Sequence, residues 1–199
     1  MEDEIDKYED YISAFLVKLS SKNISNNDSK TMSIILHSIN DFERMSDHAF
    51  NINRIMKDMS KKKLVFSDYA KKDLKVMCSA LTDITTRTVN IFIREDESAA
   101  RTIEPLEEII DKLNKEAKQK HIIRLREGKC TIELGLLLED LITNIERISD
   151  HCSNVGIAII EIRTDDYGAH EYIKHLNKEE GSFFHEEYLA LEKEYQLEK

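Results

Sequence analysis

The stretch DFERMSDHAFNI at residues 41–52 decides the fold, because the chain repeats it as NIERISDHCSNV at residues 144–155. The two copies are offset by 103 residues. Each copy sets a glutamate and an aspartate four positions apart, and an asparagine follows four positions later. Positions four apart lie one turn apart on the same face of an α-helix, so each copy predicts a helix with these three side chains on one face.

The apolar residues of both copies lie on the opposite face of the predicted helices. At about 100° per residue they cluster about 160° around the helix from the acidic pair. In the first copy they are Phe42, Met45, Ala49, Ile52 and Met56, and in the second Ile145, Ile148, Cys152, Val155 and Ile159. The sequence therefore predicts two core helices of one geometry, whose acidic pairs face away from the core.

A fainter repeat precedes each copy. The segment EDEIDK at residues 2–7 resembles EEIIDK at residues 107–112, at an offset of 105, and each again has a carboxylate pair four apart. Each half of the chain therefore holds two helices in the same order. A helix predicted over residues 67–94 precedes the second pair, and by symmetry we expect a matching helix ahead of the first pair. We therefore expect this chain to be a fragment of a longer protein.

Composition predicts an all-α protein. Only 5 glycines and 1 proline interrupt 199 residues, which leaves few breaks for the turns of a β fold, and 41% hydrophobic content can supply a core. The net charge of −10 disfavours nucleic acid and favours cations as partners. Three widely spaced cysteines fit a reducing cytosolic setting. No run approaches the ~18 apolar residues that span a bilayer, so we expect no membrane insertion by this segment.

Helix signals divide the chain into long helices with short connections. We expect helices over residues 2–20, from Asp28 or Ser29 to about 59, 67–94, then one that ends near 126, 130–163, and a terminal helix at 184–197. Pro105 either starts or kinks the helix that ends near residue 126. The segment REDES at residues 94–98 is predicted to be an acidic turn.

The repeated acidic pairs are candidate metal ligands. Two acids at i and i+4 repel each other by roughly a few tenths of a kcal/mol, and an isolated pair is usually a solvated helix face. Four such pairs on neighbouring helices favour another reason, because Asp, Glu and Asn oxygens suit Mg, Mn, Ca or iron. We therefore expect metal binding on the surface of the bundle.

Other polar residues of the motifs are expected to have structural roles. Arg44 and Arg147 are predicted to form salt bridges to a neighbouring helix, with contact to phosphate or a partner as the alternative. His48 and His151 are predicted to donate or accept structural hydrogen bonds rather than bind metal.

The cysteines are predicted to be small core residues. The terminal aromatic residues are predicted to dock the last helix on the body, with a dimer contact as the alternative; they are Phe183, Phe184, Tyr188 and Tyr195.

Catalytic machinery is absent from the sequence. The motifs are not the Glu-x-x-His pairs of di-iron oxidases, and the chain contains no Walker A loop, GxSxG or HExxH. We therefore expect a protein that is not an enzyme, with a metal-dependent oxidase or phosphatase as the lowest-ranked alternative.

Together the motifs resemble those of the PhoU family, helical regulators of phosphate uptake built from two tandem three-helix units. ERMSDHAFNI and ERISDHCSNV are similar to the doubled signature of that family, and the likeness covers residues 2–163. The resemblance implies iron clusters, or another divalent metal such as zinc or manganese, at the paired acids. The implied ligands are Glu2, Asp6, Glu43, Asp47, Glu107, Asp111, Glu146 and Asp150, with Asn51 and Asn154 as additional ligands.

The chain departs from a free-standing PhoU protein at both ends. The first helix of unit one is missing, and an acidic and aromatic tail follows the second unit. Both features are similar to the PhoU-like domain of sodium/phosphate cotransporter proteins. That likeness implies a regulatory domain on the cytoplasmic side of the membrane, partnered by the transporter domain of the same full-length chain.

The sequence predicts three parts. Residues 1–63 form an incomplete first repeat, residues 64–163 a second repeat, and residues 164–199 a tail with a short helix. The alternative function is a helical scaffold without metal that acts as a dimerisation module.

Overall fold

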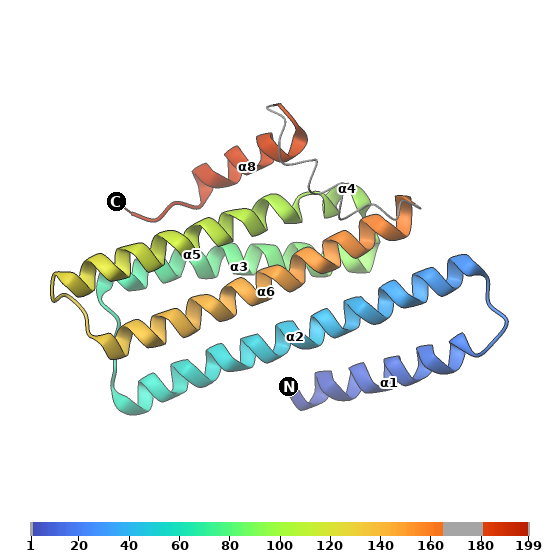
Figure 1. Cartoon of the computed structure of the whole chain (residues 1–199), viewed down its shortest axis with the longest axis horizontal. Coiled ribbons are helices and arrows are strands. Elements are labelled where there is room, and N and C mark those ends of the chain that lie inside the picture. The colour runs from blue at the N-terminus through green and yellow to red at the C-terminus, as the bar shows by residue number, and fades with distance from the viewer. Residues whose placement is uncertain (1, 165–180, 199) are drawn as a thin grey trace.

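The structure is a computed structural model that describes residues 2–164 and 181–198, and it is a bundle of long helices. The all-α prediction is confirmed. The helices, labelled in Figure 1, are α1 (Glu2–Ser20), α2 (Asn26–Lys62), α3 (Asp68–Arg94), α4 (Glu97–Ala100), α5 (Ile103–Arg126), α6 (Ile132–Thr164) and α8 (Phe183–Glu194).

Polar caps explain where the long helices begin. The Ser25 hydroxyl accepts a hydrogen bond from the backbone N–H of Asp28 at 3.1 Å, so α2 begins before the predicted cap at Asp28 or Ser29. A serine followed three positions later by an acid is a capping arrangement that the sequence prediction overlooked. Helix α3 begins close to the predicted residue 67 and is capped by Ser67, whose hydroxyl accepts a hydrogen bond from the backbone N–H of Ala70 at 3.3 Å.

Left-handed residues end two helices. Lys63 has a φ of 55° and donates its backbone N–H to the carbonyls of Met59 and Ser60, which ends α2 three residues later than predicted. Glu95 has a φ of 50° and ends α3 near the predicted residue. The predicted acidic turn contains the short helix α4, capped by the Asp96 side chain. Pro105 lies in the first turn of α5, where its missing N–H has no helical partner to lose.

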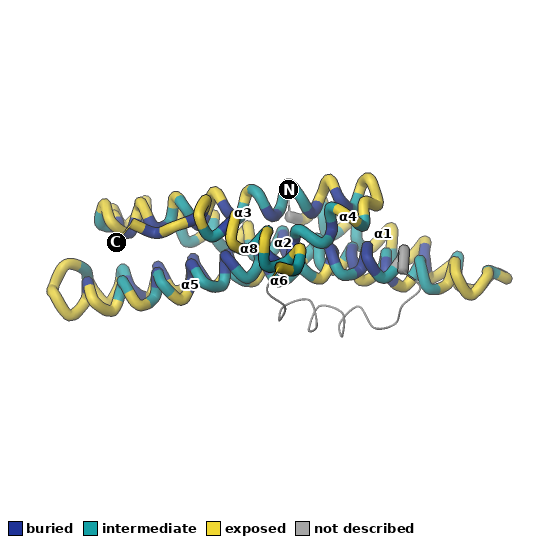
Figure 2. Tube along the Cα trace, turned by 90° about the horizontal axis from the view of Figure 1, so that it is seen from above, coloured by how far each residue is buried: buried dark blue, intermediate teal, exposed yellow. Residues whose placement is uncertain are grey.

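The helices α2 and α6, which carry the repeated motif, lie side by side in the centre of the bundle (Figure 1). Helix α1 packs on α2 as α5 packs on α6, and α3 packs on both α5 and α6. We refer to α1–α2 as the first unit and to α3–α5–α6 as the second unit. The core follows the apolar stripe of α6, where Ile142, Ile145, Ile148, Cys152 and Val155 are buried. Figure 2 shows buried segments inside the bundle and exposed ones at the tip of the α5–α6 hairpin.

The terminal helix α8 packs on α5. It ends at Glu194, earlier than predicted, because Tyr195 and Leu197 leave the helix and are buried in the core. The Tyr195 hydroxyl donates to Asp83 at 3.1 Å. Tyr188 packs against the core as predicted, but Phe183 is half exposed and does not dock. The polar stretch 165–180, predicted to belong to the tail, lies outside the described residues.

The three cysteines have different environments. Cys152 is fully buried, as predicted, and Cys130 is half-buried. Cys78 of α3 is exposed, so its prediction as a core residue is wrong. Among the described helices, none is long and apolar enough to cross a membrane.

Candidate metal centres

The two copies of the motif face each other across the interface of α2 and α6. His48 Nδ1 lies 2.9 Å from Asn144 Oδ1, and His151 Nδ1 lies 2.8 Å from Asp41 Oδ1. Asp41 and Asn144 occupy equivalent positions in the two copies, so the two contacts are reciprocal. The prediction that these histidines make structural hydrogen bonds is confirmed. The histidine of each motif therefore connects its own helix to the other one, α2 to α6 and α6 to α2.

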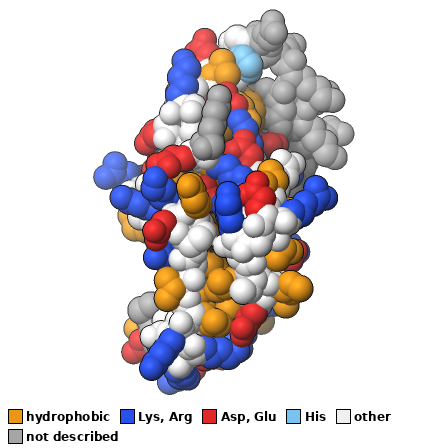
Figure 3. Space-filling view, turned by 90° about the vertical axis from the view of Figure 1, so that its left-hand side faces the viewer, with side chains coloured by type: hydrophobic (Ala, Val, Ile, Leu, Met, Phe, Trp, Pro, Cys, Tyr) orange, Lys and Arg blue, Asp and Glu red, His pale blue; other side chains and the backbone are white. Residues whose placement is uncertain are grey.

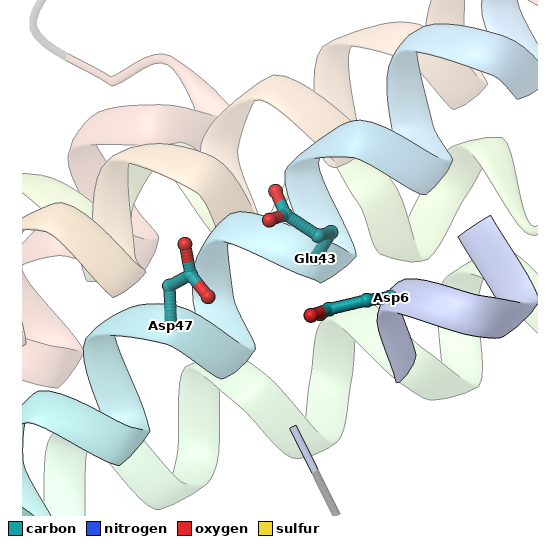
Figure 4. A group of neighbouring side chains, drawn as sticks. All are labelled: Asp6, Glu43 and Asp47. Carbon is teal, nitrogen blue, oxygen red and sulfur yellow. The ribbon is translucent and has the colours of Figure 1, made fainter. Parts of the chain in front are cut away.

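The first acidic cluster joins α1 to α2. Asp6 projects from α1 toward Glu43 and Asp47 of α2, as Figure 4 shows. One carboxylate oxygen from each residue lies within 4.8 Å of the others. The predicted ligands of the first repeat therefore converge on one point between two helices.

The carboxylates of the first cluster lie in an unfavourable electrostatic environment. Burial, and then the neighbouring carboxylate of Asp47, raise the pKa of Glu43, and Asp6 and Glu9 add to the rise. Asp6 Oδ1 is buried without a hydrogen-bond partner. A buried carboxylate oxygen without a hydrogen-bond partner destabilises the fold unless a cation lies next to it. The first cluster therefore fits a cation.

The second acidic cluster joins α5 to α6. Glu107 and Asp111 lie one turn apart on α5, and Asp150 reaches them from α6. Their nearest carboxylate oxygens also lie within 4.8 Å of one another. The cluster stands at the same place in the second unit as the first cluster does in the α1–α2 unit.

The second cluster is more strongly perturbed than the first. Burial, followed by the charges of Glu104 and Asp111, raises the pKa of Glu107 to about 8. Burial also raises the pKa of Asp150, against the opposing charge of Arg147. A carboxyl group with a pKa near 8 holds its proton at neutral pH, because burial and then the charges of the neighbouring carboxylates disfavour its ionised form. A bound divalent ion would supply the missing charge.

Among the described residues, the basic side chains that pair with acids of the two clusters lie on the exposed rim. Arg44 and Arg147 pair with acids of their own motif rather than with a neighbouring helix, so that prediction is wrong. The pairs at the rim are Arg44–Glu43 and Arg147–Asp150 at 3.5 Å and Lys115–Asp111 at 3.7 Å. Exposed pairs of this length contribute about 0–1 kcal/mol and do not neutralise the clusters.

Glu146, a predicted ligand, lies outside the second cluster. Its carboxylate accepts a hydrogen bond from the Asn114 side chain at 3.2 Å, and Lys118 Nζ lies 3.7 Å away. In the first unit the equivalents of Asn114 and Lys118 are Glu9 and Ser13, which bring no positive charge. Glu43, the counterpart of Glu146, therefore stays in its cluster.

The remaining predicted ligands are not placed in the clusters. The side chain of Glu2 lies outside the described part of the structure. Asn154 donates to Asp41 at 3.2 Å and so supports the helix interface. Asn51 is half-buried, one turn beyond Asp47, and its side chain has no hydrogen-bond partner among the described residues.

Two further acids border the clusters. Glu9 acts on Glu43, and Glu104 has the largest effect of any single charge on Glu107. Glu104 also accepts a 2.5 Å hydrogen bond from the Ser153 hydroxyl, which links α5 to α6. Glu9 lies three positions from Asp6, and Glu104 lies three positions from Glu107, each on the same helix face as that ligand. A search of the sequence for acids at this spacing would therefore have identified both.

Three converging carboxylates suit a hard cation. Magnesium, manganese, calcium and iron take several oxygen ligands, and water can complete a shell that the protein leaves open. Neither cluster offers histidine or cysteine ligands among the described residues.

Comparisons with known proteins show the family of this chain. A family model described as PhoU domain matches residues 1–56 and 74–159, which contain both clusters. The chain belongs to the PhoU family. A curated relative, the phosphate-specific transport system accessory protein PhoU homolog 1 of Thermotoga maritima, is 29% identical over 130 residues. That alignment covers 65% of this chain and 55% of the relative.

Solved PhoU structures share the fold of this chain. PhoU from Pseudomonas aeruginosa superposes with a TM-score of 0.77 at 20% identity, covering 83% of this chain and 78% of that one. The phosphate transport system regulatory protein PhoU from Streptococcus pneumoniae gives 0.68 at 22% identity, covering 83% and 76%. An uncharacterised protein of Deinococcus radiodurans is 26% identical over 62% of this chain and 44% of its own length. The chain thus spans about half the length of the curated relatives it matches.

Proposed function

We propose that this PhoU-family chain regulates phosphate transport and binds divalent metal or an iron cluster at its two carboxylate clusters. The observation that carries the proposal is the pair of clusters at equivalent places in the two units, each with a raised pKa at its centre. The name of the Thermotoga maritima relative, an accessory protein of phosphate transport, supports the regulatory part.

The residues that would hold metal are Asp6, Glu43 and Asp47 in the first cluster and Glu107, Asp111 and Asp150 in the second. Glu2, Glu146, Asn51 and Asn154 are secondary candidates. The ion would supply positive charge and no reaction. Its effect would be mechanical, because each cluster joins two helices and ligation would hold α1 against α2 and α5 against α6.

The same proposal includes the membrane partner. The chain acts as the cytoplasmic domain of a sodium-dependent phosphate cotransporter and regulates the transporter domain of the same polypeptide. The resemblance of the acidic and aromatic tail at residues 164–199 to such domains supports this assignment. Phosphate uptake by the full-length protein, with and without this domain, tests it.

Metal analysis tests the clusters. Protein purified without chelator, then reconstituted with iron, zinc and manganese, is expected to hold metal at both clusters. Asp6→Asn should remove the first site and Asp150→Asn the second. Asp10→Asn on α1 and Asp140→Asn on α6 are matched controls, because both side chains are exposed and outside the clusters. If the protein holds no metal after reconstitution, the metal-binding proposal is wrong, and the helical scaffold without metal remains as the alternative function.

The scaffold alternative has one observation in its favour. Glu146, a motif glutamate, is already satisfied by Asn114 and Lys118 and needs no ion. If the domain is a plain dimerisation module, amide variants of the clusters will leave its regulation of transport unchanged.

A further inference from the structure

A pocket of about 170 Å³ lies between the start of α3 and the end of α5, at the end of the bundle where Figure 1 places the C-terminus and the turn from α5 to α6. The charged side chains that line it are four basic and two acidic ones, namely Lys72, Lys120, Arg124, Lys129, Asp73 and Glu198. Figure 3 views this end of the bundle, where lysine and arginine side chains gather with acidic ones between them. The chain as a whole has a net charge of −10, so the pocket carries charge of the opposite sign. A concave surface with surplus positive charge favours an anion.

The acid that α3 contributes to the pocket is fully engaged. Asp73 is 5% exposed, and its two carboxylate oxygens accept from Arg124 Nη1 at 2.9 Å and from Lys120 Nζ at 3.2 Å. One carboxylate offsets only one of these two cations. Positive charge therefore remains between α3 and α5 after Asp73 has been paired.

Arg124 also brings a hydrogen-bond donor that the protein does not satisfy. The residue is 8% exposed, and its second terminal nitrogen, Nη2, is buried without a hydrogen-bond partner among the described residues. A guanidinium keeps its charge at any physiological pH and holds its N–H groups in a fixed fork. A buried donor without a partner is destabilising, because the group has lost its contact with water. This nitrogen therefore favours a ligand with an acceptor oxygen, such as an oxyanion.

An anion of the chain itself already lies at this pocket. Glu198 Oε2 lies 2.7 Å from Lys72 Nζ, and Lys120 Nζ donates to the backbone carbonyl of Glu198. Both members of the side-chain pair are more than half exposed, and exposed pairs of this kind contribute little to stability. The segment itself is held by Tyr195 and Leu197, which are buried. The Glu198 carboxylate can therefore leave Lys72 while the rest of the segment stays in place.

Charge decides which anion fits the pocket best. Lys129 pairs with Glu127 at 2.8 Å, so three cations and Asp73 remain when Glu198 turns away. A single carboxylate offsets one of the two surplus charges. A phosphate group carries close to two negative charges at neutral pH and three acceptor oxygens, and arginine binds such oxygens with two parallel hydrogen bonds. A phosphate group therefore matches the pocket better than the Glu198 carboxylate does.

We propose that this pocket binds a phosphate group, either as inorganic phosphate or as a small phosphate monoester, in exchange for the Glu198 carboxylate. The phosphate oxygens accept hydrogen bonds from Arg124 Nη2, Lys72 Nζ and Lys120 Nζ, and the bound group holds α3 against α5. The proposal is independent of metal binding, because none of these residues belongs to either carboxylate cluster. It goes beyond the proposed function, because it adds a ligand site that makes the contact of Glu198 with α3 depend on phosphate.

Isothermal titration of the whole chain with inorganic phosphate, at an ionic strength held constant with chloride, tests the pocket. Saturable binding is expected. Glu198→Gln should tighten it severalfold, because the competing carboxylate is removed. In that background Lys72→Gln should weaken it about tenfold, which is the loss expected for one charge-assisted hydrogen bond. Lys71→Gln is the matched control and should leave the affinity unchanged, because Lys71 pairs with Asp68 on the same helix and does not line the pocket.

The variant Arg124→Lys tests the buried nitrogen. It keeps a positive charge beside Asp73 but removes the Nη2 donor, so the affinity for phosphate should fall about tenfold. Because Arg124 is buried, urea unfolding must show that the variant is folded, and Lys72→Gln decides the question if it is not.

A parallel titration with glycerol phosphate distinguishes the two sources of the phosphate group. Tighter binding of the ester identifies an organic phosphate as the ligand, and tighter binding of inorganic phosphate identifies the free ion. No saturable binding of either compound, or an equal affinity in Glu198→Gln with and without Lys72→Gln, would overturn the proposal. The metal content of these variants is expected to equal that of the wild type. Loss of phosphate binding alone therefore counts against the pocket, whereas failure to bind metal counts against the proposed function.

Discussion

The imidazole rings of His48 and His151 stack across the α2–α6 interface, with centroids 5.8 Å apart and planes 25° apart. Each ring comes from one copy of the repeated motif, and each hydrogen-bonds to the opposite helix. Two equivalent side chains of the repeated motif therefore lie next to each other where α2 packs on α6.

Replacing these histidines should weaken the joint between the units. His151→Ala removes a half-buried contact with Asp41, and we expect a loss of about 1–2 kcal/mol in the free energy of unfolding. Urea denaturation followed by circular dichroism measures it. A double-mutant cycle with His48→Ala should reveal coupling, because the rings touch. Strictly additive losses would mean that the stacking contributes nothing.

Stability of the metal-free protein should depend on Glu107. Its pKa is raised from 4.5 to about 8, so the folded state binds its proton more tightly than the unfolded state does. The stabilisation from that proton is complete below pH 4.5 and is lost as the pH rises toward 8. Glu107→Gln should remove this loss. Denaturation midpoints at pH 5 and pH 8 in chelator test it, and an unchanged slope in the variant would contradict the raised pKa.

Metal binding should release a proton from the second cluster. Glu107 must ionise to act as a ligand, so affinity should rise about tenfold per pH unit below its pKa of about 8. Calorimetry in buffers of different ionisation enthalpy counts the protons released. Asp150→Asn serves as the control without a site. Binding that does not change between pH 6 and pH 8 would contradict this mechanism.

Removal of metal should loosen both hairpins. A ligand at 100 times its dissociation constant adds about 2.7 kcal/mol to the free energy of unfolding, so chelation should lower the Tm by several degrees. Hydrogen exchange should rise most in α1, which is held mainly by α2. Faster exchange spread evenly over all helices would argue against clamping at the clusters.

Lys118 is expected to explain why Glu146 lies outside the second cluster, whereas its counterpart Glu43 belongs to the first. It lies 3.7 Å from Glu146 and helps to keep that residue out of the second cluster. Lys118→Met should free Glu146 to act as a ligand and raise metal affinity at the second cluster several-fold. Glu146→Gln should cancel that gain while leaving the wild-type affinity nearly unchanged. Isothermal titration of the two single variants and of the double variant distinguishes these outcomes.

The buried acid of α3 should be structurally essential. Asp73 is 5% exposed and bonds Arg124 at 2.9 Å and Lys120 at 3.2 Å. Asp73→Ala leaves the buried guanidinium of Arg124 without its partner, so we expect a loss of about 3–5 kcal/mol. Thermal melts measure it. Asp68→Ala, an exposed acid on the same helix, is the control and should change stability by less than about 0.5 kcal/mol.

The sequence could predict the elements of the fold because local patterns set them. The period of the apolar stripe gave the helices, and the offsets of the repeats gave their pairing. The acidic pairs were placed correctly on the face away from the core, since that follows from 100° per residue. The start of α2 was misplaced because two serines compete as caps, and the Ser25 hydroxyl reaches the backbone of Asp28.

The sequence by itself determined an all-α bundle with repeated acidic pairs on matching helix faces, because helix geometry converts spacing directly into direction. Only the tertiary structure decided which acids meet. Asp150 joins Glu107 and Asp111, while Glu146 turns to Asn114 and Lys118. It also decided that the apolar side chains of Tyr8, Ile12 and Phe15 on α1 are exposed. Such contacts depend on the packing of helices distant in sequence, and no local spacing encodes that packing.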